Sequence, residues 1–193
     1  CMVGEIPAAK AATPDWTPPE DVLVIIPHCW FPVTAAASKA TEDEIPLFGW
    51  LDDGWLDMPN APSMSPAEPV KQFVKWRKDG FKIKKVGHDR KFARPYVAAM
   101  KKEKFSVVDQ PQLAVAKSEG FRYIEHKAKI GCLYYCHAEP FLYCVGNVKA
   151  LKDDEIVIYE KVEDNKRIDV FDAAVFASIR FLIDTEKVSK AAE

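Results

Sequence analysis

Cysteine and histidine residues gather in one short stretch of the sequence. Cys132, Cys136 and His137 fall within six residues, and Cys144 follows closely. Thiolates and imidazoles are the ligands that zinc prefers. Structural zinc sites usually hold paired cysteines two to four residues apart on turns, whereas residues 132 and 136 of one strand would lie about 13 Å apart, at about 3.3 Å per residue. The spacing therefore favours buried structural cysteines, and a small Cys/His metal-binding protein or enzyme is kept as an alternative.

Other catalytic chemistries lack a complete signature. Haem attachment of the c type needs Cys-x-x-Cys-His, but Leu133 stands where the first cysteine is required. A cysteine nucleophile could meet a histidine only in space, and the sequence does not select one among His28, His88 and His126. No Gly-x-Gly-x-x-Gly, Gly-x-x-x-x-Gly-Lys-Ser/Thr or Gly-x-Ser-x-Gly motif occurs. We therefore predict that the chain is not an enzyme and holds no catalytic residue, cofactor or metal.

The strongest signal is a basic segment, residues 70–104. It holds thirteen basic and three acidic side chains, a net charge of +10, with five aromatic rings interleaved and Phe105 directly after it. Cations pair with phosphates and rings stack on bases, so the segment suits an RNA-contacting subunit of a ribonucleoprotein, which is the first alternative. A core of rings with solvated lysines behind them is the competing interpretation. The candidate contacts are Lys82, Lys84, Lys85, Arg90, Lys91 and Arg94.

The elements that would position these residues are helices followed by strands. Apolar spacing and Gly80 predict a helix from about residue 65 to 80, and further helices are expected at 95–104 and 111–120. Asp172 is expected to cap a terminal helix. β-Branched and aromatic residues predict strands at 121–126, 129–135, 141–148, 155–162 and 167–171, with a hairpin loop at 163–166. The prediction is an α+β domain over 65–193, with a mostly antiparallel sheet and helices on one face.

The first third of the chain has a different composition. Eleven of the 14 prolines lie before residue 70, and only a short strand, Val22–Ile26, shows a regular pattern. Residues 1–64 are therefore predicted to form a long, extended, acidic, proline- and tryptophan-rich arm. A large amphipathic ring anchors such a segment on a surface. The predicted anchors are Trp16, Trp30, Trp50 and Trp55.

Charge divides the chain in the same way. Residues 1–69 carry a net charge of -9 and the remainder +7. This asymmetry predicts a non-catalytic accessory subunit of a large intracellular complex, whose arm wraps neighbouring subunits. The absence of an initiator methionine suggests a removed targeting sequence and thus a mitochondrial, respiratory or energy-converting complex. Protein subunits are the expected partners, nucleic acid and peripheral membrane contact are secondary, and no transmembrane helix is expected.

Overall fold

A computed structural model describes residues 1–89, 94–110, 112–152 and 156–192. The fold is mixed α/β, with 47% helix and 19% strand distributed over small sheets. The chain forms two compact units: unit 1 combines residues 1–28 and 113–193, and unit 2 is residues 29–112.

Unit 1 contains a three-stranded sheet with both strand orientations. Its strands are β1 (Met2–Ile6), β2 (Val22–Ile26) and β7 (Leu133–Tyr134), in the order β1-β2-β7. β1 runs antiparallel to β2, and β2 runs parallel to β7. The strand expected at Val22–Ile26 is confirmed, and Leu23 and Ile25 are fully buried within it. The expectation of mostly antiparallel sheets is wrong, because three of the five strand pairs in the described part of the chain are parallel.

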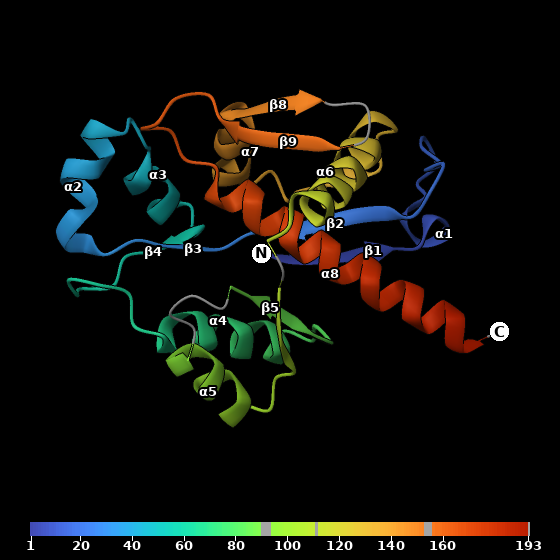
Figure 1. The fold of residues 1–193 in the computed structure, drawn as a ribbon, viewed down its shortest axis with the longest axis horizontal. Coiled ribbons are helices and arrows are strands. Elements are labelled where there is room, and N and C mark those ends of the chain that lie inside the picture. Colours follow the sequence, from blue (N-terminus) through green and yellow to red (C-terminus); the bar gives the residue numbers. More distant parts are fainter. Residues whose placement is uncertain (90–93, 111, 153–155, 193) are drawn as a thin grey trace. The chain divides into compact units, whose positions relative to one another are not determined.

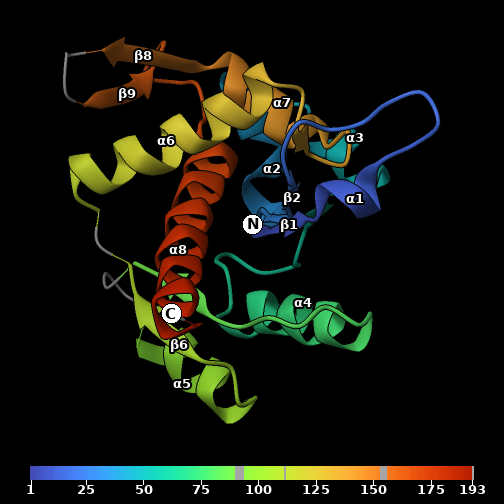
Figure 2. The same ribbon diagram turned by 90° about the vertical axis from the view of Figure 1, so that its right-hand side faces the viewer.

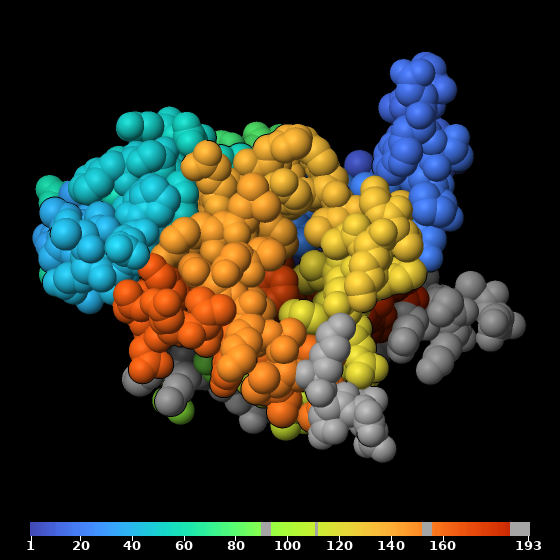
Figure 3. Space-filling view, turned by 90° about the horizontal axis from the view of Figure 1, so that it is seen from above, coloured from blue at the N-terminus to red at the C-terminus, as the bar shows by residue number. Residues whose placement is uncertain are grey.

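Helices and a hairpin complete unit 1 (Figures 1 and 2). The elements are α1 (Ala8–Ala11), α6 (Ala114–Lys129), α7 (Glu139–Gly146), β8 (Val148–Lys152), β9 (Val157–Lys161) and α8 (Asp169–Ala192). α6 packs against α8, and β9 packs against α6. The connection between β1 and β2, which includes α1, projects from the surface of unit 1 and is blue in Figure 3.

Gly120 marks the close approach of α6 to α8. A Cβ atom at this position would lie 2.6 Å from the carbonyl oxygen of Val175 and 2.8 Å from Cγ1 of Ile179. Gly120 was expected to end a helix, but it lies inside α6. Its role is steric, because only a residue without a side chain allows the two helices to pack at this distance.

Three expected strands do not form. Residues 169–171 of the strand expected at 167–171 are the start of α8. Residues 121–126 belong to α6 and residues 141–148 largely to α7. Aromatic and β-branched residues predicted strands there, but burial along one helical face against α8 outweighs that weak preference. Pro140 lies in the first turn of α7, where proline is tolerated. The hairpin pairs β8 with β9, so the loop expected at 163–166 is not its turn, whereas the strand expected at 155–162 is confirmed by β9.

Unit 2 is built from short helices and pairs of parallel strands (Figure 1). Its elements are β3 (Cys29–Trp30), α2 (Val33–Glu42), α3 (Leu47–Asp52), β4 (Leu56–Asp57), α4 (Ala67–Lys78), β5 (Val86–His88), α5 (Arg94–Lys102) and β6 (Val107–Asp109). β3 pairs with β4, and β5 pairs with β6 across the intervening helix α5. Val70, Val86, Met100 and Phe105 form the buried core of the second half of this unit. The helices expected near 65–80 and 95–104 are confirmed by α4 and α5.

Residues 1–64, all of which the structure describes, do not form an extended proline-rich arm. They contain three helices and four strands. Pro7, Pro32, Pro46 and Pro66 are the N-cap residues of α1, α2, α3 and α4. Proline lacks an N–H that a helix start would leave unpaired, and its fixed φ suits entry to a helix. Three of the prolines that predicted an extended arm, and Pro66 just beyond it, therefore lie at helix starts.

No helix within the described part of the chain is long and apolar enough to cross a membrane.

Candidate functional site

The parallel pair β5–β6 in unit 2 brings polar side chains to one sheet edge. The carboxyl ends of both strands meet there, with His88 paired to Asp109 in the β-sheet register. Nε2 of His88 lies 3.1 Å from Oδ1 of Asp109, and Nδ1 lies 2.7 Å from the carbonyl oxygen of Asp89. His88 thus ties the ends of the two strands together. Ligands of α/β sheets characteristically bind beyond the carboxyl ends of parallel strands.

Gln110 adds a buried amide to this edge. The residue is only 6% exposed, and neither Oε1 nor Nε2 forms a hydrogen bond with the residues that the structure describes. Gly87 leaves room for it, since a Cβ there would lie 3.2 Å from Oε1 of Gln110. An unsatisfied buried amide costs about 1–3 kcal/mol. Such a group in a folded protein calls for a water or ligand partner. We refer to His88, Asp89, Asp109 and Gln110 as the β5–β6 edge site.

The β5–β6 edge site has a weak signature in the sequence, separate from the cysteine cluster and from the basic side chains. Two short segments each begin with valine and contain one aspartate: Val86-Gly87-His88-Asp89 and Val107-Val108-Asp109-Gln110. Their parallel pairing depends on the crossover through α5. The two acids can be associated only once that crossover is known.

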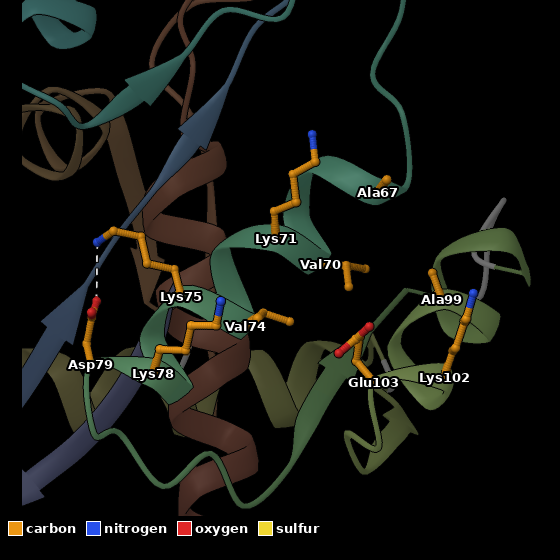
Figure 4. A pocket seen from close by; sticks show the side chains of 10 residues that line it. All are labelled: Ala67, Val70, Lys71, Val74, Lys75, Lys78, Asp79, Ala99, Lys102 and Glu103. Carbon is orange, nitrogen blue, oxygen red and sulfur yellow. Dashed lines mark hydrogen bonds and ion pairs between the residues drawn. The ribbon is translucent and has the colours of Figure 1, made fainter.

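A second feature of unit 2 is a groove of about 580 Å³ between α4 and α5 (Figure 4). Four lysines and two acids line it above a floor of small apolar side chains. The charged residues are Lys71, Lys75, Lys78, Asp79, Lys102 and Glu103. Residues 71, 75 and 78 share one face of α4 at helical spacing. We call this feature the α4–α5 groove.

The candidate contacts of the basic segment that the structure describes lie in two different places in unit 2. Lys82, Lys84 and Lys85 are exposed in the connection from α4 to β5, and Arg94 is exposed at the start of α5. Arg90 and Lys91 lie outside the described residues. None of the four described side chains, Lys82, Lys84, Lys85 and Arg94, lines the α4–α5 groove. The rings of the segment mainly serve the core: Phe73 packs edge-on against Trp76 at 5.3 Å and against Phe105 at 5.9 Å.

The predicted tryptophan anchors do not share one environment. Trp16 is 41% exposed and Trp50 is 5% exposed, while Trp30 and Trp55 are half-buried. Trp16 lies in the projecting connection between β1 and β2 of unit 1. The other three belong to unit 2. Partner binding by these four residues stays a prediction.

The cysteine cluster in unit 1 has a structural character. Cys132 and Cys144 are buried, Cys136 is half-buried, and all three are free thiols. Burial raises the pKa of both the Cys136 and the Cys144 thiols. His137 packs against the rings of Tyr134 and Tyr135. Protonated thiols are poor nucleophiles and poor metal ligands, so this geometry favours packing over catalysis.

Lys127 is the centre of a charge network in unit 1. Its ammonium group lies 3.0 Å from Oε1 of Glu5 and 3.1 Å from Oε2 of Glu20, and it donates to the carbonyl oxygen of Asp21 at 2.7 Å. Tyr123 donates a hydrogen bond to the same oxygen of Glu5. Burial lowers the pKa of Lys127, but the hydrogen bonds to Glu5 and Glu20 outweigh it, and the pKa is raised overall. The network ties α6 to β1 and to the start of β2.

Glu20 gives this network a testable pH dependence. The hydrogen bonds from His126 and then from Lys127 lower the pKa of the Glu20 carboxyl group. A group with a lowered folded-state pKa stabilises the protein above its ordinary pKa and loses that contribution as the pH falls through the lowered value. We expect wild-type protein to lose more thermal stability than a Glu20→Gln variant between about pH 5 and pH 3. Thermal unfolding across this range measures the effect, and equal losses would contradict it.

The acidic, cysteine and histidine side chains do not assemble into a metal centre in the part of the chain that the structure describes. Taking residues 1–89, 94–110, 112–152 and 156–192 together, no three histidine, cysteine, aspartate or glutamate side chains lie close enough to hold a metal ion. The donor sets of the β5–β6 edge site and of the cysteine cluster are therefore incomplete as metal sites within these ranges.

Comparison with known proteins identifies the fold. No protein-family model matches the sequence, and the search of curated proteins finds no match. Among solved structures, the chain is similar to the large terminase of bacteriophage HK97, with a TM-score of 0.68 and 18% sequence identity. The similarity covers 78% of this chain and 32% of that protein, so the chain spans about a third of the terminase. At this identity the comparison shows the fold.

This fold corrects three expectations. It resembles the fold of part of a phage large terminase, and this likeness contradicts the predictions of a non-catalytic accessory subunit and of a chain that is not an enzyme. The association with a mitochondrial respiratory or energy-converting complex loses its support for the same reason. Protein or nucleic-acid partners are consistent with the fold.

Proposed function

We propose that this chain is a nucleic-acid-processing part of a terminase-type enzyme, and that it hydrolyses phosphodiester bonds in DNA. The observation that carries the proposal is the fold likeness to a phage large terminase, an ATPase/nuclease type of DNA-packaging enzyme. Because the chain spans 32% of that protein, only part of its chemistry is expected here.

The sequence favours one of the two terminase activities, ATP hydrolysis and DNA cleavage, over the other. ATP hydrolysis by a P-loop enzyme needs the Gly-x-x-x-x-Gly-Lys-Ser/Thr loop, whose backbone N–H groups hold the phosphates. This chain contains no such loop. The activity that we assign to it is therefore DNA cleavage.

The β5–β6 edge site offers suitable side chains for cleavage. In hydrolysis, a water oxygen attacks phosphorus while its proton passes to a base, and the bond to the leaving oxygen breaks as that oxygen takes up a proton. The exposed carboxylate of Asp89, at the end of β5, is positioned to orient such a water and to accept its proton. Asp109, whose Oδ1 contacts Nε2 of His88, holds the imidazole at the strand ends.

Many nucleases bind two metal ions between carboxylates. The described side chains at the β5–β6 edge do not reach the three ligands that a metal ion would need. We therefore assign no step of the reaction to a metal ion.

The test is a cleavage assay on the purified protein. Supercoiled plasmid is incubated with the protein in Mg²⁺, in Mn²⁺ and in EDTA, without ATP in every case. We expect nicked and linear DNA in at least one of these conditions. If the plasmid stays intact in all of them, the assignment of DNA cleavage is wrong, whether or not the protein binds DNA.

A further inference from the structure

We propose that the α4–α5 groove binds the phosphate backbone of duplex DNA, and that Lys78 and Lys102 make the principal contacts. This inference rests on the proposed function for the choice of DNA as ligand. Its evidence comes from the groove itself, and its test requires binding without cleavage.

Two of the four lysines that line the groove are paired with acidic side chains, and the other two are not paired with any described residue. Lys75 pairs with Asp79 at 3.2 Å, and Lys71 pairs with Glu68 at 2.8 Å. Lys78 and Lys102 line the groove from opposite helices, and neither forms an ion pair with any residue that the structure describes. Two cations are thus available to an anionic ligand.

The second acid of the groove is also neutralised. Arg77 donates to the carbonyl oxygen of Glu103 at 2.7 Å, and its guanidinium lies 3.4 Å from Oε2 of the same residue. The guanidinium also stacks over the ring of Phe105 at 4.5 Å. Each acid that lines the groove therefore has its own basic partner, which leaves the pair Lys78 and Lys102 to set the local potential.

The walls of the groove are held in place before any ligand binds. The Arg77–Glu103 contact joins the last turn of α4 to the end of α5. Val70 and Val74 lie at the floor, and Val70 belongs to the buried core that also contains Met100 of α5. A preformed site loses little conformational entropy on binding, and an apolar floor suits the sugars between successive phosphates.

An acidic amphipathic helix from a partner protein could also fit a groove between two helices. The surroundings favour a long polyanion instead. Residues 70–104 carry a net charge of +10, and this charge extends well beyond the groove. Exposed lysines without an ion pair to the described residues also follow α4, at Lys82 and Lys84, and lie near the end of α5, at Lys101 and Lys104. An excess of positive charge of this size attracts the regularly spaced phosphates of duplex DNA.

The test measures binding of a fluorescent DNA duplex to the full chain in EDTA, by anisotropy, over a series of salt concentrations. Loss of two phosphate contacts reduces the slope of log K against log salt by about 2 and weakens binding about tenfold at low salt. We expect this result for the double variant Lys78→Gln/Lys102→Gln. A matched control, Lys10→Gln/Lys149→Gln, removes two exposed lysines of unit 1 and should change affinity less than twofold.

Every outcome decides the question. A selective loss in the groove variant supports the proposal. Equal losses in both variants would mean that overall charge governs binding, and unchanged binding in the groove variant would mean that DNA binds elsewhere; either result overturns the proposal. Displacement of the duplex by polyglutamate at equal charge concentration would indicate an acidic protein ligand instead. None of these results depends on the cleavage assay, so the groove can fail while DNA cleavage stands.

Discussion

Replacing Gly120 by valine is expected to lower the free energy of unfolding by about 3 kcal/mol. The added Cβ would lie 2.6 Å from the backbone oxygen of Val175, so no change of rotamer can relieve the clash. α6 would have to move away from α8, and the packing between them includes Ile179 and Val175, both buried. Gly120→Ala should cost less, because alanine regains about 1 kcal/mol of helix propensity.

Chemical denaturation followed by circular dichroism measures this effect. Gly146→Val, at the end of α7 in the same unit, is the matched control, because a Cβ there meets no heavy atom within 4 Å. If Gly120→Val and Gly146→Val have the same stability, the close approach of α6 and α8 is not what requires glycine at position 120.

Asp89→Asn is expected to reduce DNA cleavage at least about 100-fold while duplex binding is retained. General base catalysis typically contributes about 10²–10⁴-fold, and an amide cannot accept the proton. The substitution keeps the size of the side chain and the backbone carbonyl that faces His88. Removal of one negative charge should leave binding of a polyanion unchanged or slightly tighter.

Cleavage rate and anisotropy on the same preparation separate catalysis from binding. Asp52→Asn, an exposed acid on α3 of the same unit, controls for the change in net charge. Cleavage by Asp89→Asn at the wild-type rate would show that the β5–β6 edge site is not where the reaction takes place, and the catalytic residues would have to be sought elsewhere.

Local sequence patterns predicted the elements whose apolar residues are continuous or regularly spaced along the chain. β2 is a continuous apolar run, and α4 and α5 have apolar residues at helical spacing, so all three were predictable. The second half of α6 was not, because Phe121, Tyr123 and Ile124 favour strands locally, whereas its first half falls within the helix expected at 111–120. The helix forms there because it places Ile124 and Gly120 against neighbouring elements. One of these neighbouring elements is α8, which lies some 50 residues later in the chain. The local sequence pattern around residue 120 therefore cannot indicate that contact.

The site was harder to predict than the fold. The basic character of residues 70–104 was evident, but the charges that gather in the α4–α5 groove are those of Lys71, Lys75, Lys78 and Lys102 and not those of the densest run, Lys82 to Lys85. Helical phase decides which lysines share a face, and packing of α4 on α5 decides which face becomes a groove. Neither can be read from a count of charges.

Unit 1 is formed from two separate stretches of the chain, and this affects the order in which the two units fold during synthesis. β2 gains its second neighbour only from Leu133 and Tyr134, more than 100 residues after Leu23. Unit 2 is continuous, so its contacts can form while the chain is still emerging from the ribosome. We therefore expect the first 28 residues to wait for translation of the C-terminal third, and unit 2 to be the earlier of the two to resist proteolysis in nascent chains.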